Sequence, residues 1–100
     1  MGYVYILQCA DGTYYVGSTT HLEARLWQHQ NGPHGAAYTR HRRPVKLVWC
    51  GELETVAHAF AFEKQVQGWS RAKRIALIEG RFDELPELAS RPTARGARPA

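Results

Sequence analysis

The sequence predicts a small α+β domain in which helices flank a three-stranded antiparallel sheet, with the elements in the order β-β-α-β-α-α. Two runs rich in tyrosine and valine lie near the start, separated by an Asp-Gly pair that is typical of a hairpin turn. A third strand-like run occupies the middle of the chain, and helix caps with apolar residues at helical spacing follow the second and third runs. The length of 100 residues suits one compact domain and is too short for two.

The first two strands are predicted at residues 3–9 and 13–18, where β-branched and aromatic side chains dominate. Between them, Ala10-Asp11-Gly12 supplies residues that accept the positive φ of a tight turn. The hairpin brings two triplets onto neighbouring strands, Tyr3-Val4-Tyr5 and Tyr15-Val16-Gly17. Two phenol groups are therefore expected side by side.

A helix is predicted after the hairpin, at residues 21–30. Thr20 and Glu23 match a capping box, in which the threonine oxygen accepts an early helical N–H and the glutamate reaches back to the cap. Asn31-Gly32-Pro33 would end this helix, because proline cannot continue the turn. Residues 31–44 have no apolar period, so we expect them to form an exposed basic loop.

A third strand is predicted at residues 45–53, and two helices follow it. Thr55 would cap a helix at residues 56–67, and Ser70 would cap a shorter one that ends before Gly80. The residues expected to face the core are Ala59, Phe62, Val66 and Trp69 for the longer helix and Ala72, Ile75, Ala76 and Ile78 for the shorter one.

The domain is therefore expected to comprise residues 1–85. Residues 86–100, rich in Pro, Gly, Ala and Arg, are predicted to form a disordered basic tail. No apolar run approaches the roughly 18 residues of a membrane helix, and the first residues lack the pattern of a secretory signal. We expect a cytoplasmic protein with no membrane partner. Cys9 and Cys50 lack metal-ligand spacing, so two reduced thiols are expected and no zinc site.

The basic residues are unevenly distributed. Three arginines lie in residues 90–100, which leaves ten basic against nine acidic residues in the rest of the chain. Two local clusters indicate a polyanionic partner more strongly than the formal charge of +4, since basic side chains gathered on one face contact phosphates. The members predicted to bind nucleic acid are Arg40, Arg42, Arg43, Lys46, Lys64, Arg71, Lys73 and Arg74. A solvated face is an equally good interpretation of the second cluster, from Lys64 onward, taken alone.

Three further residues could carry chemistry. Arg25 and His29 are four residues apart and therefore share one face of their helix, although such a pair alone is more often decoration facing solvent. Glu63 lies among aromatic and aliphatic residues, where a carboxylate is costly to desolvate unless it meets a cation. A tyrosine pair, a fixed guanidinium and one carboxylate are the parts that a metal-dependent phosphodiester hydrolase needs. One carboxylate suffices for Mg²⁺, which retains several waters.

In this order, the two tyrosine triplets, Arg25 and Glu63 resemble the signature of the GIY-YIG nucleases, over roughly residues 3–78. The small standalone bacterial members are the most similar, and they carry segments like residues 9–12 and 38–44 of this chain. The resemblance implies a metal-dependent endonuclease that hydrolyses DNA phosphodiester bonds, with branched or damaged DNA as candidate substrates.

The resemblance also implies roles for the site residues. Tyr5 and Tyr15 would line the site, one assisting removal of a proton from the attacking water and the other orienting the water or the phosphate; which does which stays open. Arg25 would stabilise charge on the phosphoryl oxygens. His29 would assist, since an ordinary histidine pKa near neutrality suits a proton relay. Glu63 would ligate a single Mg²⁺ or Mn²⁺ beside the leaving oxygen.

One departure from the family pattern bears on activity. Many members place an asparagine downstream of the metal glutamate, whereas the only asparagine here is Asn31, so Gln67 or Ser70 would have to take that role. Two alternatives therefore stay open: a nucleic-acid-binding module that keeps the fold without turnover, and a protein-interaction domain with Trp27 or Trp69 as an exposed anchor. Targeting would come from DNA shape, a homodimer or a partner protein.

Overall fold

The computed structural model describes residues 1–32, 37–85 and 97–98, and it contains the predicted elements in the predicted order. Strands β1 (Gly2–Gln8), β2 (Tyr14–Thr19) and β3 (Lys46–Leu53) form an antiparallel sheet with β1 in the centre. The predicted three-stranded sheet is confirmed. A two-residue strand, β4 (Ala97–Arg98), pairs with the other edge of β3. It lies within residues 86–100, the segment predicted as a disordered tail, whose other residues are outside the described ranges. The boundary between domain and tail stays a prediction.

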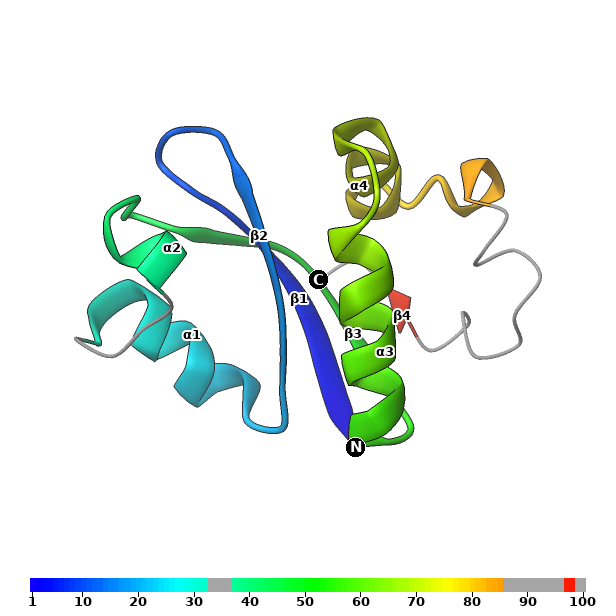
Figure 1. Cartoon of the computed structure of the whole chain (residues 1–100), viewed down its shortest axis with the longest axis horizontal. Helices are drawn as coiled ribbons and strands as arrows, with labels where there is room; N and C mark the ends of the chain where they lie inside the picture. Colours follow the sequence, from blue (N-terminus) through cyan, green and yellow to red (C-terminus); the bar gives the residue numbers. More distant parts are fainter. Residues whose placement is uncertain (33–36, 86–96, 99–100) are drawn as a thin grey trace.

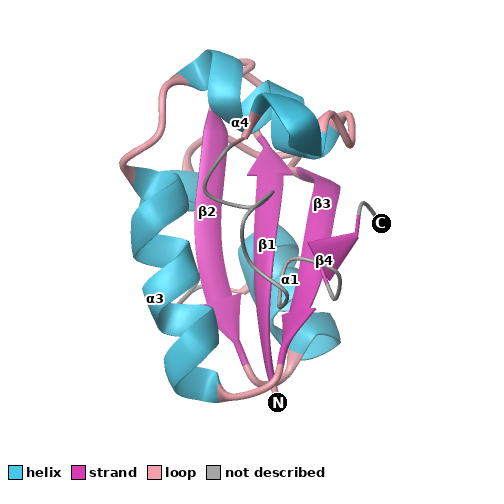
Figure 2. Cartoon of the chain, turned by 90° about the vertical axis from the view of Figure 1, so that its right-hand side faces the viewer, coloured by secondary structure: helices cyan, strands magenta, loops and turns pink. Residues whose placement is uncertain are grey.

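Helices cover both faces of this sheet (Figure 1). On one face lie α1 (Leu22–Asn31) and the short α2 (Ala37–Arg40). On the other face lie α3 (Val56–Gln67) and α4 (Arg71–Ile78), followed by the 3₁₀ turn η1 (Phe82–Glu84). Figure 2 shows α3 running along the β2 edge while α1 lies behind the strands. The edge strand β2 therefore stands between helices from the two faces.

The hydrophobic core lies between the sheet and the α3 and α4 helices. Alternation along the strands turns Ile6, Val16 and Trp49 toward this side, and the register places Ile6 opposite both of the others. From the helices and the connection between them, the core receives Ala59, Phe62, Val66, Trp69, Ala76 and Leu77. The predicted stripe of α3 is therefore confirmed.

The predicted inward face of α4 is partly wrong. Ala72 is exposed, whereas Leu77, which the spacing did not select, is fully buried. The reason is that α4 is a helix of eight residues that meets the core through its last turn, so residues of its first turn remain in solvent. The caps predicted for both helices are confirmed: the Thr55 hydroxyl accepts the amide of His58, and the Ser70 hydroxyl accepts the amide of Lys73.

The predicted hairpin turn is confirmed. Gly12 has a φ of 84°, a left-handed conformation that glycine adopts without strain. The Asp11 carboxylate accepts hydrogen bonds from both the hydroxyl and the amide of Thr13, and these bonds hold the pKa of Asp11 below its usual range. The tip of the hairpin is thus closed by its own side chains.

The capping box predicted for the first helix is wrong. Helix α1 begins at Leu22 with His21 as its N-cap residue, and His21 makes no side-chain capping bond. The Thr19 hydroxyl accepts the His21 amide at 3.1 Å, and the Thr20 hydroxyl lies 2.9 Å from Nδ1 of the His21 ring. Local bonds of these two threonines replace the cap that the sequence pattern suggested.

The exposed loop predicted at residues 31–44 is also wrong in its described part. Helix α2 forms there, and Thr39 within it is fully buried. The Arg43 guanidinium donates to the carbonyl oxygens of His29 at 2.7 Å and Gly32 at 2.6 Å, and to a third carbonyl one residue before His29. The His29 carbonyl lies in the last turn of α1 and the Gly32 carbonyl just beyond it, while the third carbonyl, that of Gln28, also accepts the Gly32 amide. The arginine therefore closes that helix end.

Cys9 and Cys50 are free thiols, and burial raises the pKa of both. Across the described ranges, no group of three or more His, Cys, Asp or Glu residues is arranged to hold a metal ion. Within the same ranges, no helix combines the length and the apolar character needed to cross a bilayer.

Candidate active site

Two tyrosines lie together on the α1 side of the hairpin. Tyr5 in β1 is 1% exposed, and its ring centroid is 6.3 Å from that of Tyr15 in β2. The register sets Tyr5 opposite Gly17, and a Cβ atom placed on Gly17 would lie 2.5 Å from the Tyr5 hydroxyl oxygen. Gly17 therefore leaves the space that the Tyr5 phenol occupies.

His29 joins this pair from α1. Its ring is fully buried, and Nε2 lies 2.8 Å from the Tyr5 hydroxyl oxygen. The other ring nitrogen, Nδ1, lies 2.7 Å from the Thr39 hydroxyl oxygen. The His29 ring also packs against Tyr15, with 4.9 Å between centroids. A continuous polar chain thus runs from β1 through α1 to α2.

The two titratable groups in this series of hydrogen bonds, Tyr5 and His29, are uncharged at neutral pH. Burial raises the pKa of Tyr5 to about 12, against an opposing contribution from the Arg25 guanidinium. Burial lowers the pKa of His29 to about 4, helped by the positive charges of Arg25 and Arg43. The near-neutral histidine pKa expected from the sequence is therefore wrong, because the ring is desolvated beside two guanidinium groups.

The depressed pKa of His29 predicts acid sensitivity. Between its ordinary value of 6.5 and about 4, the unfolded chain binds a proton at His29 that the folded chain does not. The free energy of unfolding should therefore fall as the pH drops through this window, by at most about 1.4 kcal/mol per pH unit from this group. Urea unfolding of the wild type and of His29→Gln at pH values from about 8 to about 4 measures the difference. A wild-type curve with the same slope as the variant would contradict the prediction.

Arg25 lies on the same side of the sheet. Its side chain is half-buried on α1, and Nη1 donates to the Gln28 side-chain oxygen at 3.0 Å. Its positive charge opposes the rise in the pKa of Tyr5 and contributes to the lowered pKa of His29. Arg25 therefore acts on the same side of the sheet as the two phenols.

Glu63 is a buried carboxylate on α3, with 9% of the residue exposed. The Ser18 hydroxyl donates to Oε1, and the Gln67 amide donates to Oε2 at 2.7 Å. The Gln67 amide also donates to the Val16 carbonyl, so it ties the carboxylate to β2. Of the two residues considered for the role of the absent asparagine, Gln67 contacts the glutamate, whereas Ser70 caps α4.

Strand β2 separates the phenols from the carboxylate. Successive side chains alternate between the faces of a strand, so Tyr15 and Gly17 face α1 while Ser18 faces α3. Glu63 therefore approaches the edge strand from the side opposite to Tyr5. Its charge is still close enough to contribute to the raised pKa of Tyr5. The candidate site is built around residues 15–18 of the edge strand.

The Glu63 carboxylate fits one divalent ion. Each oxygen accepts one hydrogen bond from a neutral donor and keeps a further lone pair. Lys64 lies 3.5 Å from Oε2, but its side chain is 54% exposed and can turn away. A single carboxylate matches the preference of Mg²⁺ for one or two carboxylates together with waters and phosphate oxygens.

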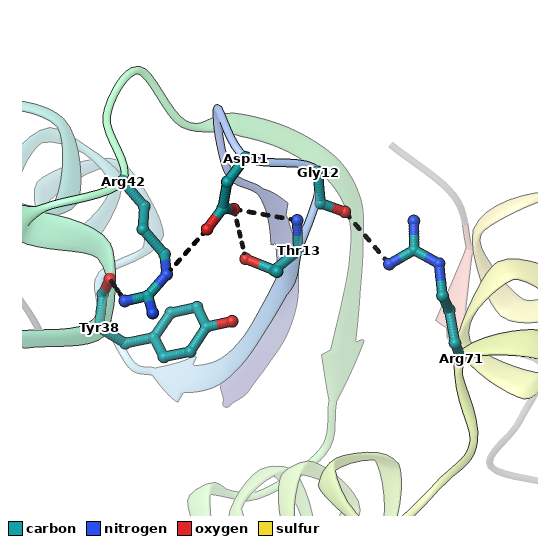
Figure 3. A network of polar contacts seen from close by, with 6 residues as sticks. All are labelled: Asp11, Gly12, Thr13, Tyr38, Arg42 and Arg71. Carbon is teal, nitrogen blue, oxygen red and sulfur yellow. Dashed lines mark hydrogen bonds and ion pairs between the residues drawn. The ribbon is translucent and has the colours of Figure 1, made fainter.

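Two of the predicted nucleic-acid-binding residues flank the hairpin tip, one on each side (Figure 3). Arg42 pairs with Asp11 at 3.0 Å and lies over the Tyr38 ring, 4.0 Å from its centroid. Arg71 donates to the Gly12 carbonyl at 3.1 Å and lies over the Tyr14 ring. The two basic clusters of the sequence therefore meet at the tip.

The other predicted cations have varied surroundings. Arg74 donates to the carbonyls of Val66 and Gln67 and thereby closes the end of α3, as Arg43 does for α1. The Lys64 and Lys73 ammonium groups lie over aromatic rings, those of Phe60 and Trp69. Arg40 and Lys46 are exposed. Contact with nucleic acid stays a prediction for all eight.

Sequence reasoning missed two residues of the site. Thr39 carried no signal, since residues 31–44 show no apolar period and read as a loop. Ser18 could have been found, because alternation along β2 turns it toward the helix that carries Glu63.

The two tryptophans proposed as exposed anchors differ in position. Trp27 is 61% exposed, whereas Trp69 is 8% exposed and belongs to the core, so Trp69 was wrong as an anchor.

Comparison with known proteins agrees with this architecture. Residues 1–76 match the GIY-YIG catalytic domain. A UPF0213 protein of Syntrophus aciditrophicus is 44% identical over 77 residues, which cover 77% of this chain and 88% of that protein. A UPF0213 protein of Natronomonas pharaonis is 43% identical, with 76% and 88% covered. The solution NMR structure of a UPF0213 protein from Bacillus halodurans superposes with a TM-score of 0.52 at 40% identity, covering 79% of this chain and 84% of that one. The chain therefore belongs to the GIY-YIG catalytic domain family.

Proposed function

We propose that this protein is a metal-dependent endonuclease that hydrolyses phosphodiester bonds in DNA. The observations that support the proposal are the two neighbouring phenols on the α1 side of β2, the buried Glu63 carboxylate that binds Ser18 of the same strand from the α3 side, and membership of a nuclease-type family. In the proposal, Arg25 and the phenols on one side and Glu63 on the other act on one phosphate at this edge strand. These groups supply hydrogen bonds, a fixed positive charge and a metal ligand, which are the requirements of phosphodiester hydrolysis.

Glu63 would hold Mg²⁺ or Mn²⁺, and the bound ion would stabilise negative charge on the leaving oxygen. The chain itself orients the carboxylate through Ser18 and Gln67, one donor to each oxygen. Such outer contacts fix the direction in which a carboxylate presents its remaining lone pairs. In this proposal, Gln67 takes the place of the absent asparagine.

Arg25 binds the phosphoryl oxygens in this proposal. A guanidinium is always ionised and offers donors in a planar fork that matches two oxygens of a phosphate. Held on the same side of the sheet as the Tyr5 phenol, it requires little rearrangement as charge develops on the phosphoryl group.

The two phenols divide the handling of water. With a pKa of about 12, Tyr5 is ionised in only about one molecule in 10⁵ at pH 7. Tyr5 therefore acts as a neutral hydrogen-bonding group that orients the attacking water, and its hydroxyl is itself held by His29. Tyr15 is then the phenol that assists removal of the proton from that water. His29 acts through Tyr5 and does not store the proton.

Cleavage of a panel of labelled DNA substrates tests the proposal. Duplex, flap, fork and four-way DNA are incubated with the protein and Mg²⁺ or Mn²⁺, alongside Arg25→Ala and Arg25→Lys. We expect metal-dependent nicking by the wild type and a loss on the order of 10²-fold or more in Arg25→Ala. Arg25→Lys should recover only part of the rate, since an ammonium cannot form the planar fork.

The other outcomes discriminate between the alternatives. Nicking that survives Arg25→Ala at full rate would indicate a contaminating nuclease. Binding of DNA without nicking in either metal would support a binding module that has kept the fold. Absence of binding even at low salt would leave the protein-interaction interpretation, for which the exposed Trp27 is the remaining anchor. A substrate preference without any base preference would point to recognition of DNA shape, by one copy, a homodimer or a complex with a partner protein.

A further inference from the structure

Thr39 is a buried hydroxyl to which the sequence analysis assigned no role in the site. It lies on α2 with no exposed surface, and its oxygen is 2.7 Å from Nδ1 of His29. The same connection holds the main chain of His29, because Arg43 Nε donates to the His29 carbonyl at 2.7 Å. His29 is therefore fixed at its ring and at its backbone by residues of one short segment.

The hydrogen bonds of the His29 ring permit two arrangements of protons. A neutral imidazole has one N–H, so one ring nitrogen donates and the other accepts. If Nδ1–H donates to Thr39, then Nε2 accepts the proton of the Tyr5 hydroxyl. If the Thr39 hydroxyl donates to Nδ1, then Nε2–H donates to the Tyr5 oxygen. In the first arrangement, the Tyr5 oxygen can accept a hydrogen bond from the site. In the second, the Tyr5 hydroxyl can donate one to the site.

The surroundings of Tyr5 favour the first arrangement. The phenol is 1% exposed, and a buried hydroxyl proton requires an acceptor. The phenol oxygen lies 2.8 Å from Nε2 of His29, whereas the positive charge that acts on Tyr5, that of Arg25, belongs to a group that can only donate. The phenol proton is therefore satisfied if it points to Nε2.

We propose that Thr39 is a positioning residue of the nuclease site: by accepting Nδ1–H, it fixes the tautomer of His29 and so makes the Tyr5 oxygen an acceptor toward the site. An acceptor oxygen can hold one hydrogen of the attacking water while leaving the water lone pair directed away from it. Thr39 itself touches neither water nor phosphate. The inference rests on the proposed function, but its structural part can be measured without catalysis.

The test combines NMR of the His29 ring with kinetics. Two-bond ¹H–¹⁵N correlation spectra show which ring nitrogen carries the proton. In the wild type and in Thr39→Ser, we expect the proton on Nδ1. In Thr39→Val, which keeps the shape and removes the acceptor, we expect loss of the single Nδ1–H form. On a cleavable DNA, kcat should fall about 10- to 100-fold in Thr39→Val with KM unchanged, and Thr39→Ser should recover it.

Thr20→Val is the matched control, because the Thr20 hydroxyl also contacts Nδ1 of a histidine, His21, but on the surface. It should change neither the His29 tautomer nor kcat. Retention of the Nδ1–H form in Thr39→Val would overturn the inference, as would a changed tautomer with an unchanged kcat. A wild type that cuts no DNA would overturn the proposed function instead, and the tautomer spectra would still decide whether Thr39 fixes His29.

Discussion

Glu63→Gln should reduce metal-dependent cleavage by about 10³-fold or more. The substitution removes the single carboxylate of the site, and with it a metal contribution of several kilocalories per mole to the stabilisation of the transition state. Glutamine has nearly the same size, and its carbonyl oxygen can accept from the Gln67 amide while its NH2 group donates to the Ser18 hydroxyl oxygen. The change in stability should therefore stay within about 1 kcal/mol.

Single-turnover cleavage in Mg²⁺ measures the rate, and urea unfolding shows whether the variant is folded under the conditions of the assay. Glu52→Gln is the control, since Glu52 is an exposed carboxylate on β3 and takes no part in the site. It should retain the wild-type rate. A folded Glu63→Gln protein that cuts DNA within tenfold of the wild type would show that Glu63 is not the metal ligand.

Gly17→Ala should remove most of the activity through a single added methyl group. The new Cβ would lie 2.5 Å from the Tyr5 hydroxyl oxygen and 2.6 Å from the ring carbon that bears it. The ring cannot retreat freely, because it is buried and its hydroxyl is bonded to His29. We expect a destabilisation of about 1–3 kcal/mol from overpacking. We also expect a loss of about 10²-fold in kcat, because displacement of a positioning group by about 1 Å can cost this much.

Gly68→Ala provides the matched control for this substitution. Gly68 ends α3 with a φ of −82°, which any residue accepts, and an added Cβ would meet its nearest atom at an ordinary 3.5 Å. The control should leave kcat unchanged and raise stability slightly, since alanine restricts the unfolded chain. Wild-type activity in Gly17→Ala would contradict the packing of Tyr5 against β2.

The order of elements and the inner face of α3 were predictable because they follow from local patterns: the spacing of Ala59, Phe62 and Val66 identifies the helix face that meets the sheet. Alternation could not identify the inner side of β1, because Val4 to Leu7 are all buried, and the register of β1 with β3 shifts between Ile6 and Leu7. The hydrogen bonds at the start of α1 were not predictable in this way. Thr19 and Thr20 both offer hydroxyls near the helix start, and only the local geometry decides between them.

The site was predictable in its members and less so in its arrangement. Tyr5 and Tyr15 lie on different strands, and Glu63 is 45 residues from its partner Ser18, so these contacts depend on how the elements pack. The pKa of His29 could not be anticipated, because it is set by burial and by guanidinium groups that tertiary structure brings near.

The sequence by itself determined the fold class, the family and the residue types available for chemistry, since hydrophobic period, turn chemistry and an ordered motif are all local properties of the chain. Only the tertiary structure decided that Thr39 and Arg43 hold His29, and that Glu63 and the phenols reach β2 from opposite faces. The physical reason is that hydrogen bonds, desolvation and charge act over a few ångströms in space, whatever the separation along the chain.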